Sequence, residues 1–160
     1  MRVLLINRRR GQVCLSPTKV MRKFLKDAIY VVETNIDDMS PVIYETVFEK
    51  LYSAGALEVF LTPVQMKKVR PGILLTTLVP KNKLKKIAEV ILRETTSFGI
   101  RYYEAKRLKL LRKIGENKGE WGKIRVNKGY IGKELVKISP EYNDCRKIAS
   151  KKNIPLKDII

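Results

Sequence analysis

Apolar residues follow two different spacings along residues 29–112, and each spacing predicts a different kind of element. Short runs rich in β-branched and aromatic side chains predict strands, whereas apolar residues that recur every three to four positions predict amphipathic helices. The pattern predicts strands at 29–35, 59–62, 73–79 and 98–111, and helices at 41–54 and 84–94. This order is that of a split βαβ arrangement, so we expect an α+β fold with a ferredoxin-like βαββαβ core.

The ends of the predicted helices come from capping residues, and their inward faces come from the apolar positions. Ser40 is expected to cap the first helix, Pro41 to occupy its first position and Gly55 to end it. The positions expected to face inward are Val42, Thr46, Val47, Phe48, Leu51 and Tyr52 in the first helix, and Leu84, Ile87, Ala88, Ile91 and Leu92 in the second.

Two further parts flank this core. Residues 1–28 are basic and irregular, and we expect them to form a flexible tail with a short helix over 16–25. Residues 113–160 are expected to form a small C-terminal β/α appendage, with strands at 121–127 and 134–138 around a turn at 128–130, and then a helix at 143–152. The predicted domains are therefore the tail at 1–28, the ferredoxin-like domain at 29–112 and the subdomain at 113–160.

The chain carries a large excess of positive charge. It has 34 Lys and Arg against 16 Asp and Glu, which gives a formal net charge of +18. Such a charge attracts nucleotides, RNA, DNA or an acidic membrane surface. Lysine-rich surfaces also occur on heat-stable proteins, where they need no anionic partner. The charge thus predicts a phosphorylated partner without selecting one.

Residue types that are absent or rare exclude several kinds of site. The sequence has no His, so a serine-type triad, a zinc deaminase centre and most transition-metal sites are excluded. Cys14 and Cys145 lie far apart without a CxxC partner, which predicts neither a zinc knuckle nor a disulfide framework. No apolar run approaches the roughly 20 residues of a membrane helix. We therefore expect a protein of the reducing cytoplasm.

A pair of carboxylates and a basic loop are the first candidates for ligand binding. Asp37 and Asp38 lie where a strand meets a helix, so they could hold a divalent cation, or else only cap the helix. Lys67, Lys68 and Arg70 lie in a loop between two strands, where Pro71 and Gly72 fix a turn. These three cations suit a triphosphate, although such clusters are also common on solvated surfaces.

Two further candidates lie near helix ends. Thr95, Thr96 and Arg101 place hydroxyls and a guanidinium at a helix-to-strand junction, which suits an anion, although Thr is also ordinary at a helix end. Cys145 lies at the start of the last predicted helix, where a thiol could ligate a soft metal or could be a small buried residue. Walker, GxGxxG and RNP motifs are absent from the sequence.

Four segments together carry a family resemblance: ETNIDDMSP at 33–41, AGALEVFLTPVQMKKVRPG at 54–72, ETTSFGIRYYEAKRLKLLR at 94–112 and SPEYNDCRKIA at 139–149. They resemble the carboxy-terminal part of the LarC family, the nickel-insertion proteins for the nickel-pincer cofactor of lactate racemase. The resemblance runs from about Ile29 to the end of the chain, and the first 28 residues do not take part in it.

The resemblance implies part of a cyclometallase, of the lyase class, that places Ni²⁺ into pyridinium-3,5-bisthiocarboxylic acid mononucleotide in a CTP-dependent reaction. Implied partners are CTP with Mn²⁺ or Mg²⁺, the mononucleotide, a larger N-terminal part and other copies of the chain, and no membrane or nucleic acid. Alternatives are an RNA-binding module, which the charge favours, and a structural oligomerisation domain.

Side-chain chemistry assigns roles within this reading. Asp37 and Asp38 would hold the divalent ion that accompanies CTP. Lys67, Lys68 and Arg70 would neutralise the phosphates, Thr95, Thr96 and Arg101 would line the same pocket, and Cys145 would contact nickel.

Overall fold

The computed structural model describes residues 24–119 and 122–160. The chain divides into two compact units, of which one is Lys26–Leu108 and the other includes Lys109–Ile160. We call them the ferredoxin-like unit and the C-terminal unit, and each is described by itself.

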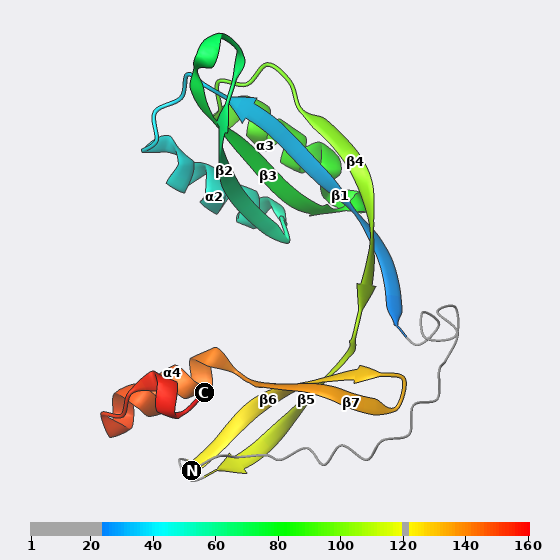
Figure 1. Cartoon of the computed structure of the whole chain (residues 1–160), viewed down its shortest axis with the longest axis vertical. Helices are drawn as coiled ribbons and strands as arrows, with labels where there is room; N and C mark the ends of the chain where they lie inside the picture. The colour runs from blue at the N-terminus through cyan, green and yellow to red at the C-terminus, as the bar shows by residue number, and fades with distance from the viewer. Residues whose placement is uncertain (1–23, 120–121) are drawn as a thin grey trace. The chain divides into compact units, whose positions relative to one another are not determined.

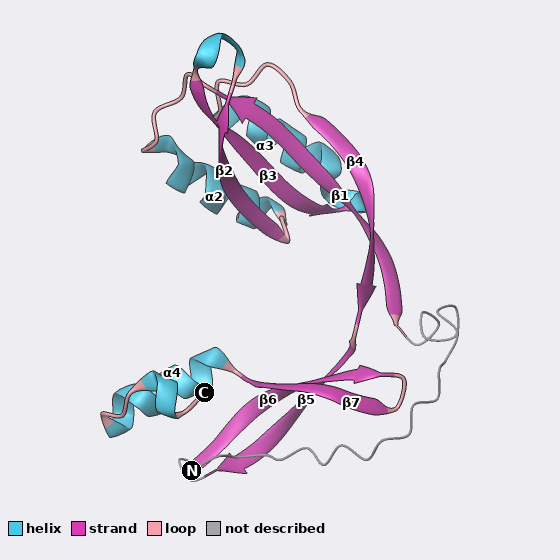
Figure 2. Ribbon diagram, in the orientation of Figure 1, coloured by secondary structure: helices cyan, strands magenta, loops and turns pink. Residues whose placement is uncertain are grey.

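The ferredoxin-like unit contains one four-stranded sheet and two α-helices, in the order that the hydrophobic pattern predicts (Figures 1 and 2). Its elements are β1 (Leu25–Ile36), α2 (Ile43–Ala54), β2 (Glu58–Gln65), the short helix η1 (Lys67–Val69), β3 (Pro71–Pro80), η2 (Lys81–Lys83), α3 (Leu84–Glu94) and β4 (Arg101–Lys109).

The strand order confirms the ferredoxin-like core. The sheet runs β2-β3-β1-β4, and both β1 and β2 pair antiparallel with β3. β3 therefore lies between β1 and β2, the two strands that α2 connects, which is the split βαβ arrangement. β4 is shorter than the predicted strand at 98–111, because residues 98–100 belong to the connection from α3 and residues 110–111 follow its end.

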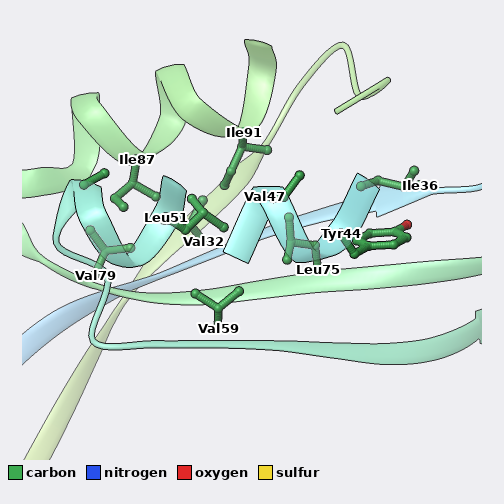
Figure 3. Close-up of a cluster of buried hydrophobic side chains, with 11 residues drawn as sticks. Val32, Ile36, Tyr44, Val47, Leu51, Val59, Leu75, Val79, Ile87 and Ile91 are labelled. Atoms are coloured by element: carbon green, nitrogen blue, oxygen red, sulfur yellow. The ribbon is translucent and has the colours of Figure 1, made fainter. Parts of the chain in front are cut away.

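The hydrophobic core lies between the sheet and the two helices (Figure 3). Val32 of β1 pairs with Thr77 of β3, which pairs with Val59 of β2, so alternate residues of three strands face the helices. Leu51 of α2 and Ile87 of α3 are fully buried on the other side of this core. Thr77 contributes a buried hydroxyl for which the described residues supply no hydrogen-bond partner.

The start and the inward face of α2 differ from the prediction. Ser40 is not the N-cap and Pro41 is not the first helical position, because α2 begins at Ile43 with Val42 as its N-cap and without a side-chain capping bond. The Ser40 carbonyl accepts from the N–H of Ile43 in the turn before the helix. Val42, Thr46 and Tyr52 are exposed rather than inward, as is Leu92 of α3. The C-terminal end is confirmed, since Gly55 follows α2 with a left-handed φ of 103°. The buried face of α2 is formed by Tyr44, Val47, Leu51 and Ala54.

The elements of the C-terminal unit are β5 (Leu111–Gly119), β6 (Gly122–Ile131), β7 (Glu134–Pro140), α4 (Tyr142–Lys152) and η3 (Leu156–Asp158). Its strands form an antiparallel sheet in the order β5-β6-β7. The predicted turn at 128–130 is wrong, since Gly129 lies within β6 at a register shift and the strand ends at Ile131. The predicted final helix is confirmed as α4, whereas the sequence pattern does not predict β5.

Two sequence predictions concern the beginning of the chain. The short helix expected over 16–25 falls mostly outside the described residues, but Leu25 itself lies in β1 and not in a helix. The expected flexible tail also lies largely outside them. Within the part of the chain that the structure describes, every helix is too short or too polar to span a bilayer.

Candidate functional site

Three connections of the ferredoxin-like unit meet at one end of its sheet (Figure 1). They are residues 37–42 after β1, residues 66–70 between β2 and β3, and residues 95–100 before β4. The antiparallel register explains this meeting, because Ile36 at the end of β1 pairs with Ile73 at the start of β3. Residues that are distant in the sequence are thereby brought together.

The acidic pair and the basic loop approach each other at this end. The Arg70 Nη1 atom lies 3.5 Å from the Asp37 Oδ2 atom, and both Lys67 and Lys68 are exposed on the same loop. Lys68 and Val69 each have a φ of 58°, a left-handed conformation that is costly for a β-branched residue such as Val69. The loop thus holds its cations in an unusual backbone geometry.

Asp38 is bound from the third connection. The Thr96 hydroxyl donates a short hydrogen bond to an Asp38 carboxylate oxygen, which links residues 58 positions apart. Asp38 also acts on Tyr44 of α2, because the pKa of the Tyr44 phenol is raised by burial and by the negative charge of Asp38. The Asp38 carboxylate therefore has a neutral hydroxyl and a protonated phenol in its surroundings.

The third connection is attached to β1 by a buried hydroxyl. Thr34 donates to the Gly99 carbonyl over 2.9 Å and shares a short hydrogen bond with the Ser97 hydroxyl. The Thr95 hydroxyl donates to the Ile91 carbonyl at the end of α3, over 2.8 Å, and accepts from the Ser97 N–H over 3.2 Å. These bonds fix the path of the connection and leave Phe98, between Ser97 and Gly99, fully exposed.

Arg101 is directed to the helix-free face of the sheet. Its Nε atom donates to Glu33 over 2.9 Å and its Nη1 atom donates to Asn35 over 2.5 Å. Glu33 and Asn35 alternate along β1 with the helix-facing Val32 and Ile36, so they lie on the opposite face. The Arg101 guanidinium is therefore already paired, unlike the exposed lysines of the basic loop.

A surface depression lies next to the acidic pair. It has a volume of about 550 Å³, and its lining includes Asp37, Tyr44 and Gln65. Gly72 forms part of its wall, where a Cβ atom would lie 2.9 Å from the Ile36 carbonyl oxygen. A side chain at this position would push apart the end of β1 and the start of β3. Glycine is thus required here by a close backbone approach.

The donor set suits a cation that phosphates also bind. The described residues contain no group of three or more His, Cys, Asp or Glu that could hold a metal by itself. Mg²⁺ and similar ions are nevertheless commonly held by one or two carboxylates together with substrate phosphates. Asp37 and Asp38, with the basic loop beside them, fit that second kind of site.

Cys145 lies in the other unit and has a different environment. It is fully buried in α4, and burial raises the pKa of its thiol, as do the charges of Asp144 and Glu141. A buried protonated thiol is a poor metal ligand, because the thiolate is the form that binds metals. This geometry favours the packing role among the two alternatives for Cys145.

The sequence did not identify Thr34, Tyr44 or Glu33 as members of this region. Thr34 and Tyr44 follow strand and helix periodicity and therefore look like ordinary packing positions. Their only distinguishing signal is that each places a polar atom on a face that is otherwise apolar. The partners of that atom depend on the tertiary fold.

The fold and this region define an α+β protein whose ferredoxin-like unit has candidate ligands for an anion and a divalent cation at one end of its sheet. The chain belongs to the nickel insertion protein family, whose model matches residues 1–160. This match also covers the first 28 residues, which the resemblance in the sequence had left out.

Individual relatives agree with this assignment. The chain is 48% identical over 127 residues to the pyridinium-3,5-bisthiocarboxylic acid mononucleotide nickel insertion protein of Clostridium acetobutylicum, a match that covers 79% of this chain and 30% of the relative. The protein of the same name from Acetivibrio thermocellus is 44% identical over 146 residues, a match that covers 91% of this chain and 36% of that relative. The chain thus spans about a third of the length of these relatives.

Solved structures share the fold. LarC2, described as the C-terminal domain of a cyclometallase involved in the synthesis of the NPN cofactor of lactate racemase, matches in its apo form with a TM-score of 0.79 and 34% identity. That match covers 84% of this chain and 93% of LarC2. A protein from Methanopyrus kandleri, with a TM-score of 0.66, 23% identity and coverage of 84% and 85%, shares the fold alone.

Proposed function

We propose that this chain is the carboxy-terminal, nucleotide-binding part of a nickel-insertion enzyme of the lyase class. In this reaction Ni²⁺ is the substrate metal, pyridinium-3,5-bisthiocarboxylic acid mononucleotide is its acceptor, and CTP is required. The observation that carries the proposal is the likeness to LarC2, at 34% identity over 93% of that domain. The names of the relatives supply the acceptor.

In this proposal the end of the ferredoxin-like unit binds CTP together with Mn²⁺ or Mg²⁺. Asp37 and Asp38 supply carboxylate oxygens to the divalent ion, and Lys67, Lys68 and Arg70 neutralise the phosphates. The 3.5 Å approach of Arg70 to Asp37 supports this, because it places a cation and a carboxylate within reach of one ligand. An ion bound to phosphates would replace Arg70 at Asp37, and Arg70 would then turn to the phosphates.

The residues of the third connection have different roles in the proposal. Thr96 orients Asp38 through its hydrogen bond, and Thr95 fixes the end of α3 beside it. Arg101 holds the start of β4 against Glu33 and adds positive charge to the region. Cys145 does not bind nickel in this proposal, because its thiol is buried in the C-terminal unit. We place the reaction in the cytoplasm, where such a thiol stays reduced.

We further propose that another protein surface completes this site. The three most exposed large apolar side chains of the ferredoxin-like unit are Val42, Val69 and Phe98, at 83%, 80% and 103% exposure. Each of the three connections contributes one of them. Apolar groups gathered around a polar site are typical of an interface, so a second copy of the chain or the N-terminal part of the enzyme would cover them.

Reconstitution of nickel insertion tests the proposal. The chain is combined with the N-terminal part of a relative, a nickel salt, CTP and the mononucleotide, and mass spectrometry measures the nickel-containing product. We expect product only when both parts and CTP are present. The same yield without this chain, or without CTP, would contradict the proposal.

Two matched double variants distinguish a specific role of Asp37 and Asp38 from a general effect of negative charge. Asp37→Asn with Asp38→Asn should reduce product formation strongly. Glu45→Gln with Glu49→Gln, which removes two exposed charges from α2, should leave product formation unchanged. An equal loss in both double variants would indicate that the two aspartates have no specific role.

A further inference from the structure

Positive charge is distributed unevenly between the part of the chain that forms the ferredoxin-like unit and the part that follows it. Residues 26–108 contain 13 Lys and Arg against 10 Asp and Glu, which nearly balance. Residues 109–160 contain 14 Lys and Arg against 6 Asp and Glu, a clear excess of positive charge. A general adaptation of the surface would affect both parts alike, so the imbalance indicates an anionic ligand for the second part.

A groove along α4 gathers several of these charges. It has a volume of about 690 Å³ and is lined by Arg125, Asn143, Arg146, Lys147, Ser150 and Lys151. The five residues from α4 recur at spacings of three and four, so they form one stripe along the helix. From residue 143 to residue 151 the stripe is about 12 Å long at 1.5 Å per residue. It combines cationic groups with an amide and a hydroxyl.

The nearby carboxylates are already engaged by other groups. Arg125 of β6 binds Asp144 through Nε and Nη2, over 2.8 Å and 2.7 Å, and its backbone N–H adds a third bond over 3.1 Å. This clamp lowers the pKa of Asp144 to about 2 and fixes the first turn of α4 to the sheet. Glu141 accepts a hydrogen bond from Asn127 over 3.2 Å. The Arg125 guanidinium is therefore occupied by Asp144, and this ion pair attaches α4 to β6.

The other cations of the groove have no comparable partner. Within residues 24–119 and 122–160, neither Arg146, Lys147 nor Lys151 forms an ion pair. Three unpaired cations on one rigid helix face can bind several anionic groups of one small molecule. Since α4 is held by the Arg125 clamp, the spacing between these cations is largely fixed before a ligand arrives.

We propose that the α4 groove binds the mononucleotide that accepts nickel, through its phosphate monoester and its two ring-borne thiocarboxylates. This inference rests on the proposed function, which supplies a substrate with three anionic groups on one compact pyridinium nucleotide. The three cations of the stripe that form no ion pair within the described residues equal in number the three anionic groups of such a molecule. A nucleic acid would instead follow a charged surface over many phosphates. The groove belongs to the C-terminal unit, whereas the proposed CTP site belongs to the ferredoxin-like unit.

The test uses nicotinic acid mononucleotide, a pyridinium mononucleotide with one ring carboxylate, as the probe. Its affinity for the full chain is measured by isothermal titration, with inorganic phosphate and a single-stranded RNA decamer as separate arms. The groove variant is Arg146→Gln with Lys147→Gln. The control is Lys118→Gln with Lys133→Gln, which removes the same charge from exposed positions outside the groove.

We expect the groove variant to weaken binding of the probe by about tenfold or more, and the control to weaken it less than about twofold. Phosphate alone should bind more weakly than the probe and should compete with it. Equal weakening in both variants would overturn the proposal in favour of general charge. Absence of probe binding, or RNA binding that depends on the groove while probe binding does not, would also overturn it.

A CTP titration of the same variants keeps this proposal separate from the previous one. If the groove variant binds CTP normally and the unaltered chain does not bind the probe, the groove proposal fails while the CTP site stands. If the probe binds in the groove and CTP does not bind at all, the nucleotide site of the proposed function fails instead. Far-ultraviolet circular dichroism of each variant confirms that α4 still forms.

Discussion

Replacing Gly72 by Ala is expected to disturb the candidate site from within its wall. The added Cβ would lie 2.5 Å from the Met66 Sδ atom and 2.9 Å from the Ile36 carbonyl oxygen, both closer than van der Waals contact. The sulfur is at the flexible end of a side chain and can move at little cost. The Ile36 oxygen belongs to the backbone directly before Asp37, so the end of β1 has to shift.

Overpacking of this kind typically costs about 1–3 kcal/mol of unfolding free energy. We expect a loss in this range for Gly72→Ala, measured by urea unfolding followed by circular dichroism, together with weaker CTP binding as Asp37 moves. Adding Met66→Ala removes the sulfur contact and should restore only part of the stability. The remaining loss then measures the contact with the Ile36 carbonyl.

Gly99→Ala is the matched control from the same end of the sheet. No atom lies within 4 Å of a Cβ built at Gly99, so its replacement should change stability by less than about 1 kcal/mol. If Gly72→Ala is as stable as the unaltered chain, the close approach of β1 and β3 does not constrain this position. If both alanine variants lose equal stability, the cause is backbone conformation and not the contact with Ile36.

Three further changes test other parts of the structure. Thr77→Val should raise the free energy of unfolding in urea by about 1–2 kcal/mol, because it removes a buried hydroxyl without a partner among the described residues. A decrease of the unfolding free energy by the same amount would contradict this prediction. Arg125 lowers the pKa of Asp144 to about 2, so the stability that this ion pair gives the fold is complete above about pH 4 and is lost as the pH falls toward 2. Asp144→Asn should lack this loss of stability in an acid unfolding titration. The same titration curve for the variant and the unaltered chain would refute the clamp. Arg70→Gln should weaken CTP binding by about tenfold. It should change the free energy of unfolding by less than about 1 kcal/mol, because the ion pair of Arg70 with Asp37 is at the surface. A large loss of stability with unchanged CTP binding would assign Arg70 a structural role.

Hydrophobic periodicity was sufficient to predict the ferredoxin-like core, because each of its strands and helices buries one face. It failed for β5, which has few apolar residues and is mostly exposed, so that its pairing with β6 and not its burial defines it as a strand. The sequence pattern predicts a turn at Gly129. It is instead a position in β6 where a Cβ would lie 2.7 Å from the Leu110 side chain, and sequence alone does not distinguish these two uses of glycine.

The candidate site was only partly predictable. Asp37 and Arg70 were identified by residue type, and the strand order then explains why they meet. The hydrogen bond from Thr96 to Asp38 joins residues 58 positions apart, a pairing that follows from the packing of α3 and not from local sequence. Arg101 was expected to line the same pocket, but strand alternation directs it to Glu33 on the helix-free face. Its role toward CTP stays a prediction.

Nucleotide binding by the purified chain shows whether the ferredoxin-like unit carries a CTP site. Isothermal titration with CTP, ATP and GTP, each with and without Mn²⁺ or Mg²⁺, compares the three bases and the need for a cation. We expect tight, cation-dependent binding of CTP alone, which is lost when Asp37 and Asp38 are changed to Ala. Equal weak binding of all three nucleotides, unaffected by these changes, would contradict the claim that this end of the ferredoxin-like unit is a CTP site.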